Sequence, residues 1–164
     1  MKIYILKREQ LIARPRREVF AFFENPENLG KITPASVGFN ILTPRPIRMK
    51  TGTVLDYTIH LLGISVRWTT LISEYNPPYR FRDVAIRGPY SFWHHTHTFE
   101  EAKGGTIMTD EVYYALPFGI FGRMAHFFCV RRQLNYIFDY RSRIIKEIFE
   151  GADLIKTGKS AMNS

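Results

Sequence analysis

The sequence contains little cysteine and no long apolar segment. Cys129 is the only cysteine among 164 residues, which excludes an intrachain disulfide and fits a reducing compartment. The longest segment free of Asp, Glu, Lys and Arg is Ile32–Pro44, which is too short for a membrane-spanning helix. The apolar run Ile3–Leu6 is likewise too short for the core of a signal peptide. We therefore expect a soluble, cytoplasmic protein.

Acidic residues are scarce relative to basic ones. The chain has 15 Asp and Glu against 23 Lys and Arg, which gives a formal net charge of +8 at pH 7. Such an excess attracts nucleic acids and anionic membranes. The basic residues come in pairs and triplets, however, and no RNA- or DNA-reading motif accompanies them. We expect the charge to be mainly a surface property. Nucleic acid is not an expected partner, whereas peripheral membrane contact is compatible with the charge.

Aromatic residues, by contrast, are plentiful, with 13 Phe, 9 Tyr and 2 Trp. Disordered chains are poor in such residues. A chain of 164 residues, 45% of them hydrophobic, can bury a full core without a metal or a disulfide and is short for two domains. We expect one domain over 1–150, followed by a flexible polar tail over 151–164.

Proline and glycine residues divide the chain into a series of short elements and one long helix. The expected order is a strand at 2–13, a helix at 16–25, a helical turn near 29–32, and strands at 39–43, 53–62, 64–75, 79–87, 92–102 and 106–116. Apolar residues then recur three, four or seven apart from Ile120 to Ile148, which predicts one amphipathic helix over 121–149 that ends near Gly151. This helix is the only large apolar element left to cover the sheet.

A first hairpin is expected around Gly63. If Leu62 and Gly63 form a two-residue turn, Tyr57 lies opposite Trp68 on an apolar face of the sheet. The other face is then polar, and a shift of one residue would mix the two faces. The pattern therefore favours this register.

The segment around Gly104 gives the stronger hairpin signal. A turn at Lys103-Gly104 places His97 opposite Asp110 and His95 on the same face. The more apolar face carries Trp93, His95, His97, Phe99, Met108, Asp110, Val112, Tyr114 and Leu116. Polar groups on a face built for burial must be hydrogen-bonded or lie against a cavity.

The cluster of His95, His97 and Asp110 has three interpretations. The favoured one is a structural network that also orients a ligand. In the second, Asp110 orients His97 as a general base. In the third, the three residues bind a metal ion with an open position, but no further ligand is placed by the pattern. The sequence carries no nucleophile elbow, phosphate-binding loop or dinucleotide fingerprint, so neither a metal nor another cofactor is expected.

Three residues of the long helix need separate expectations. Arg131 and Arg141 fall near its apolar stripe, and we expect both side chains to extend to solvent. The alternatives are contact with Asp83 or Asp110, or a bidentate bond to a ligand carboxylate. Cys129 is expected to be a small buried hydrophobic residue.

The order of the elements and several motifs resemble a known superfamily over about residues 2–149. The motifs are Gly88-Pro89-Tyr90, Trp93-x-His95-x-His97-x-Phe99, Gly104-Gly105-Thr106, Asp110 and Leu116-Pro117-Phe118-Gly119. They resemble the START/birch-pollen-allergen superfamily, most of all its small bacterial polyketide-cyclase/dehydrase-like (SRPBCC) ligand-binding members. The resemblance implies an α+β helix-grip fold, in which a seven-stranded antiparallel sheet curls around a long C-terminal helix and two short helices follow the first strand.

That superfamily includes carriers, receptors, enzymes and cochaperones, so the fold alone leaves the function open. We expect binding or transport of a hydrophobic small molecule, such as a lipid, quinone or polyketide, in a cavity between sheet and helix. The alternatives are a cyclase/aromatase- or hydrolase-type enzyme with a His97–Asp110 acid–base pair, and a cochaperone- or ribosome-associated module. A nearly filled core is the alternative to a cavity. The candidate ligand-binding residues are Tyr57, Trp68, Phe81, Asp83, Trp93, His95, His97, Phe99, Met108, Asp110, Tyr114, Met124, Phe127, Arg131, Leu134 and Phe138.

Overall fold

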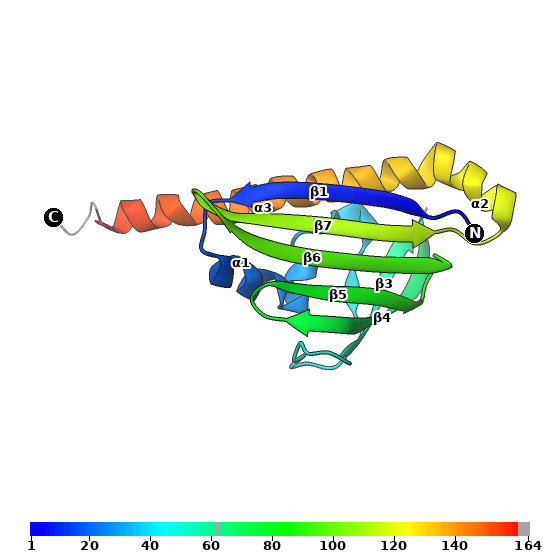
Figure 1. Cartoon of the computed structure of the whole chain (residues 1–164), viewed down its shortest axis with the longest axis horizontal. Helices are drawn as coiled ribbons and strands as arrows, with labels where there is room; N and C mark the ends of the chain where they lie inside the picture. The colour runs from blue at the N-terminus through cyan, green and yellow to red at the C-terminus, as the bar shows by residue number, and fades with distance from the viewer. Residues whose placement is uncertain (62, 161–164) are drawn as a thin grey trace.

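A seven-stranded antiparallel sheet and a long C-terminal helix form the body of the protein (Figure 1). The computed structural model describes residues 1–61 and 63–160, with side chains up to residue 151. The elements are β1 (Tyr4–Ile12), α1 (Arg16–Phe23), η1 (Pro26–Gly30), η2 (Ala35–Val37), β2 (Asn40–Ile41), β3 (Val54–Leu61), β4 (Ile64–Asn76), β5 (Arg80–Arg87), β6 (Phe92–Ala102), β7 (Gly105–Ala115), α2 (Gly119–Ala125), the π-helical η3 (His126–Val130) and α3 (Arg131–Ser160). This order confirms the expected α+β architecture.

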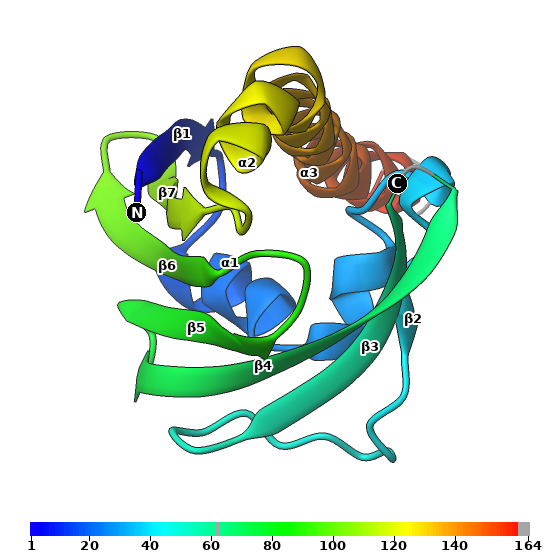
Figure 2. The same ribbon diagram turned by 90° about the vertical axis from the view of Figure 1, so that its right-hand side faces the viewer.

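The sheet is strongly curled. Its strand order is β1-β7-β6-β5-β4-β3-β2, so β1 and β2 form the two edges. Figure 2 shows the sheet bending around the interior while α3 crosses the gap between its two edges. The short helix α1 and the turns η1 and η2 occupy the concave side. Sheet, α3 and the α1–η2 segment therefore enclose the interior from different sides.

The hairpin between β6 and β7 has the predicted register. Ala102 pairs with Gly105 across the turn, and His97 pairs with Asp110. Gly105 has a φ of +150°, and a Cβ at this position would lie 2.0 Å from the carbonyl oxygen of Ile12. The hairpin thus needs glycine here because the backbone at the end of β1 lies directly against Gly105.

The hairpin between β3 and β4 also has the predicted pairing, with Tyr57 opposite Trp68 and Leu61 opposite Ile64. Its turn includes Leu62, which lies outside the described residues. Because residues alternate between the faces of a strand, the confirmed pairing places Tyr57 and Trp68 on the inner side of the curled sheet.

The C-terminal helix differs from the prediction in two respects. The expected continuous helix over 121–149 is divided into α2, the π-helical η3 and α3. It also passes Gly151, its expected end, and reaches Ser160, while residues 161–164 of the expected tail lie outside the described residues. A glycine inside a helix costs only about 1 kcal/mol relative to alanine, and no proline follows it. Within the described ranges, no helix combines the length and apolar character needed to cross a bilayer.

The buried apolar residues form two clusters, one at each end of the interior. The first is built around Phe20, Phe81 and Phe99 under α1, and the second contains Trp93 and Phe138. His95 and His97 of β6 lie between these two clusters. The polar cluster predicted from the sequence is therefore enclosed by aromatic side chains on both sides.

Candidate functional site

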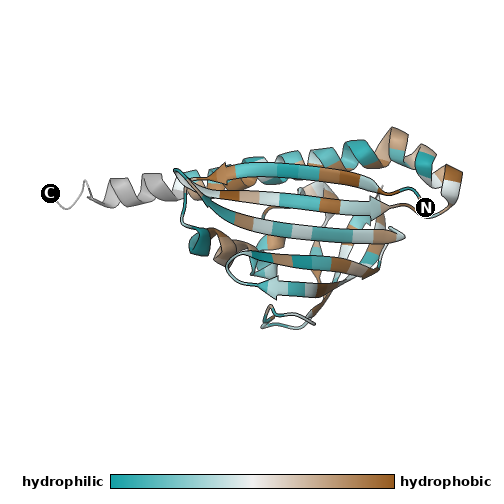
Figure 3. Ribbon diagram, viewed as in Figure 1, coloured by the Kyte–Doolittle hydropathy of each residue, from teal (hydrophilic) through white to brown (hydrophobic). Residues whose placement is uncertain are grey.

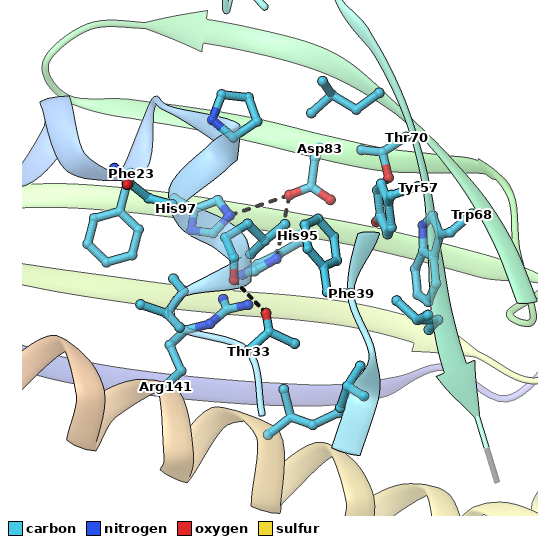
Figure 4. A pocket seen from close by; sticks show the side chains of 18 of the residues that line it. Phe23, Thr33, Phe39, Tyr57, Trp68, Thr70, Asp83, His95, His97 and Arg141 are labelled. Carbon is cyan, nitrogen blue, oxygen red and sulfur yellow. Dashed lines mark hydrogen bonds and ion pairs between the residues drawn. The ribbon is translucent and has the colours of Figure 1, made fainter. Parts of the chain in front are cut away.

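A cavity of about 170 Å³ lies between the inner face of the sheet, the turns η1 and η2, and α3. Figure 4 shows aromatic side chains around it and Asp83, His95 and His97 together on one wall. The interior is therefore not filled completely by side chains. Nine of the predicted ligand-binding residues line the cavity: Tyr57, Trp68, Phe81, Asp83, Trp93, His95, His97, Leu134 and Phe138.

Four other predicted residues are buried but do not line the cavity. Phe99 and Met108 pack inside the first apolar cluster, and each is at most 2% exposed. Tyr114 turns its hydroxyl toward the Nε2 atom of His126, at 2.9 Å. Asp110 lies behind the two histidines of β6 and contacts their far sides. We assign these residues to the support of the cavity.

Met124, Phe127 and Arg131 lie away from the cavity, which does not fit their choice as ligand-binding residues; the exposure of Arg131 agrees with the expectation that it extends to solvent. Met124 is 52% exposed and Phe127 is 73% exposed, and Arg131 is exposed as well. The π-helical η3 explains the error, because one extra residue in a helical turn rotates the following face by about 100°. The apolar spacing that runs from Met124 to Leu134 therefore does not describe one face.

Arg141 is the main residue that the sequence analysis misplaced. It is 7% exposed and lines the cavity, so the expectation that it extends to solvent is wrong. Its guanidinium carbon lies 4.7 Å from the ring centre of Phe138, and its Nη1 atom lies 3.6 Å from Oδ1 of Asp110. The alternative contact with Asp110 is thus present. The available signal was its position seven residues after Leu134, which places both on one face of α3.

Cys129 lies in η3. Cys129 is exposed, so its expected burial is wrong for the same reason as that of Phe127.

The turns and the loop before β3 contribute apolar cavity residues that carry no periodic signal in the sequence. These are Pro26, Leu29, Ile32, Val37, Phe39 and Met49. Loop residues of this kind lack the spacing from which a buried face can be inferred.

Two histidines and two carboxylates form a closed buried arrangement, which we call the His–Asp cluster (Asp83, His95, His97 and Asp110). Oδ1 of Asp110 lies 2.7 Å from Nε2 of His95 and 2.8 Å from Nδ1 of His97. The first contact is a hydrogen bond. The second is an ion-pair contact, and Nδ1 of His97 makes no hydrogen bond within the described residues. On the opposite side, Oδ2 of Asp83 lies 3.5 Å from Nδ1 of His95 and 3.4 Å from Nε2 of His97.

Burial and charge act in opposite directions on this cluster. Burial disfavours the charged form of His95, and the neighbouring His97 adds to this effect, so the pKa of His95 is lowered. Burial also opposes the charging of His97, but Asp110 and Asp83 outweigh it and raise its pKa. Burial would raise the pKa of both carboxyl groups, yet the histidines reverse this and hold the pKa of Asp110 well below its usual value. The pKa of Asp83 is lowered in the same way.

Trp68 and Arg141, which line the cavity, carry buried polar atoms without hydrogen-bond partners within the described part of the chain. These atoms are Nε1 of Trp68 and the Nε and Nη1 atoms of Arg141. Buried donors without partners are costly, so a ligand oxygen that reached these donors would form stabilising hydrogen bonds. The His97–Asp110 pair that acid–base catalysis requires is present, and a catalytic role for it stays a prediction.

The fold has relatives among solved structures. Neither a scan against protein-family models nor a search of curated proteins found a match. A protein from Thermus thermophilus has a TM-score of 0.72 and 19% sequence identity, over 91% of this chain and 99% of its own. One from Chromobacterium violaceum has a TM-score of 0.67 and 14% identity, over 89% and 96%. Ara h 8.0201 has a TM-score of 0.57 and 14% identity, over 88% and 98%.

At these identities, the likeness shows the architecture alone. The chain has the helix-grip fold. This confirms the architecture that the resemblance to the START/birch-pollen-allergen superfamily implied. The helix-grip fold hosts more than one function, so the argument for function rests on the cavity and its side chains.

Proposed function

We propose that the protein binds a hydrophobic small molecule in the internal cavity, for storage or transport. The observation that carries this proposal is the combination of apolar walls with a few convergent polar groups. Tyr57, Trp68, Trp93 and Phe138 supply apolar surface, while Arg141 and three members of the His–Asp cluster (Asp83, His95 and His97) are the polar or charged groups at the wall. Ligand sites commonly have this composition, in which apolar contact gives affinity and a few polar groups fix orientation.

The size of the cavity favours a compact ligand. Its volume of about 170 Å³ is below the roughly 300–1,000 Å³ typical of pockets for drug-sized molecules. A one- or two-ring molecule fits this space better than a long-chain lipid. Among the expected classes, a small quinone or polyketide-like ring system is therefore favoured.

The unpartnered donors favour a ligand with an acceptor group. Arg141 can donate to a carboxylate or an ionised hydroxyl from its Nε and Nη1 atoms, which make no hydrogen bond within the described residues, although Nη1 also lies 3.6 Å from Oδ1 of Asp110. The indole N–H of Trp68 can donate to a second acceptor. We infer that the ligand is an aromatic or conjugated ring with an acidic or carbonyl oxygen.

Calorimetric titration with 2-naphthoate, a two-ring carboxylate, tests this function. The Ile59→Trp variant places the largest side chain at a position that lines the cavity and should abolish binding. The matched Ile86→Trp variant, at a position 60% exposed on β5, should bind like the wild type. Unchanged affinity in Ile59→Trp would refute the cavity as the site.

Native mass spectrometry of the protein purified from its cells provides the second test. We expect a co-purified small molecule that is absent from the Ile59→Trp variant. A wild-type protein that carries no such molecule and does not bind 2-naphthoate would overturn the proposal.

A further inference from the structure

We propose that Asp83, His95 and His97 form a binding site for a divalent transition-metal ion, with zinc as the reference ion, at the wall of the cavity. One ligand atom from each residue lies within 4.8 Å of the other two. All three residues line the cavity, so an ion held there would keep an open coordination position toward it. The proposal goes beyond the proposed function and does not depend on it.

The inner distances of the cluster fit a metal ion better than hydrogen bonds. Oδ2 of Asp83 lies 3.5 Å from His95 and 3.4 Å from His97. Charge-assisted hydrogen bonds are shorter, about 2.7–2.9 Å. Ligand atoms placed about 2.1 Å from a tetrahedral zinc ion lie about 3.4 Å from one another. The carboxylate of Asp83 therefore lies at ligand spacing from each of the two histidines, which it faces in Figure 4.

The outer contacts of the cluster supply the support that metal-binding histidines need. Oδ1 of Asp110 lies 2.7 Å from Nε2 of His95 and 2.8 Å from Nδ1 of His97. These are the nitrogens that face away from Asp83. The hydrogen bond to Asp110 holds the proton of His95 on its outer nitrogen and leaves the inner lone pair for a metal, as in carboxylate–histidine–zinc arrangements, and the charge of Asp110 favours the same tautomer of His97.

The charge balance also favours a cation. Asp83 and Asp110 bring two buried negative charges, and Arg141 is the cation that contacts Asp110. Metal binding requires both histidines in their neutral form, so it displaces any proton on His97; without that proton the group carries a net charge of −1, which a divalent ion converts to +1. Two imidazoles and one carboxylate suit zinc, iron(II), cobalt or nickel rather than magnesium or calcium, which prefer oxygen ligands.

Titration of the full, chelator-stripped chain with Co²⁺ and then Zn²⁺ tests the site. We expect one ion per chain, visible absorption bands of tetrahedral Co²⁺, and loss of these bands when Zn²⁺ is added. His97→Gln and Asp83→Asn should abolish binding. Asp110→Asn, which removes only the support, should weaken it about 10- to 100-fold. The control is His94→Gln, whose side chain is exposed on the same strand, and it should bind like the wild type.

If a variant fails to fold, a measurement on the wild-type chain still tests the site. X-ray absorption of the zinc-loaded protein should show two imidazole ligands at about 2.0–2.1 Å. Absence of 1:1 binding, or binding lost in His94→Gln and kept in His97→Gln, would overturn the site. Neither result would affect binding of 2-naphthoate to the metal-free protein.

A second, independent observation concerns the surface of α2 and η3. We infer that this segment docks on an anionic lipid surface. Its large apolar side chains are exposed by 52–82%, and they are Phe118, Ile120, Phe121, Met124, Phe127 and Phe128. Figure 3 shows this end of the helix next to the N-terminus. Exposed apolar surface of this extent on a helix marks an interaction site.

The charges around this apolar surface are of one sign. The sequence has no Asp or Glu between Glu111 and Asp139, whereas Arg123, Arg131 and Arg132 are exposed there. Aromatic residues flanked by arginine are typical of segments that lie in the interface of an anionic membrane. A second copy of the chain would bring the same positive charges together, which disfavours self-association through this surface.

Co-sedimentation with vesicles tests the membrane surface. We expect the protein to bind phosphatidylcholine vesicles that contain phosphatidylglycerol, and to bind pure phosphatidylcholine weakly. Phe121→Ser combined with Phe127→Ser should reduce binding about tenfold or more. Ile64→Ser, at a site 68% exposed on β4, is the control and should not. Equal binding of the double variant, or a concentration-dependent dimer abolished by it, would overturn the inference.

Discussion

At the scale of the residue, Arg141 decides which ligands the cavity prefers. Hydrogen bonds to charged groups contribute about 1.5–3 kcal/mol, so Arg141→Met should weaken 2-naphthoate binding about 10- to 100-fold. Binding of the neutral 2-naphthamide should change much less, because it has no charge to pair. Calorimetry on both compounds measures the difference. Arg143→Met, an exposed position on the same helix, serves as the control. Equal losses for the acid and the amide would contradict the role of Arg141.

The sequence predicted part of the site at this scale, for a simple geometric reason. Side chains alternate along a strand, so the spacing of His95 and His97 and the pairing with Asp110 placed all three on the inner face. Their contact distances depend on side-chain rotamers, which no spacing encodes. Arg141 escaped prediction because a long side chain near the edge of an apolar stripe can turn either way.

At the scale of the element, the β6–β7 hairpin requires glycine at position 105, whereas position 104 only prefers it. Gly105→Ala would place a Cβ 2.0 Å from the carbonyl oxygen of Ile12, whereas Gly104→Ala meets no atom of the described residues within 4 Å. Both changes strain a backbone with positive φ, so their difference isolates the clash with β1. We expect Gly105→Ala to lower the free energy of unfolding by about 2 kcal/mol more than Gly104→Ala, measured by urea denaturation. Equal losses would show that β1 moves aside without cost.

Local sequence signals explain which strands and helices could be predicted. Strand ends coincide with glycine and proline, and hairpin register follows from the turn, so the sheet was predicted almost to the residue. The interruption of the C-terminal helix by the π-helical η3 could not be predicted in this way. One inserted residue in η3 preserves an apparent spacing of three, four and seven while it rotates the face. Phe127 and Cys129 were therefore expected inside, and both are exposed.

At the scale of the whole molecule, the buried carboxylates tie stability to pH. The folded state lowers the pKa of Asp83 and Asp110, whereas unfolding returns both to about 4. The unfolded state therefore takes up protons more readily as the pH falls. The stability contributed by the two carboxylates is present above about pH 5 and is lost as the pH falls toward their folded pKa values.

Urea denaturation of the metal-free protein at pH 7, 5 and 3 measures this dependence. The free energy of unfolding should fall more steeply between pH 5 and pH 3 in the wild type than in Asp110→Asn, because the variant has lost one of the two depressed carboxyl groups. At pH 7 the variant should be the less stable protein, since its amide cannot balance the charge of Arg141 and His97. Parallel curves for the two proteins would mean that Asp110 keeps an ordinary pKa. The His–Asp cluster would then not be held together by charge, and hydrogen bonding and packing alone would have to keep four polar side chains inside an aromatic interior.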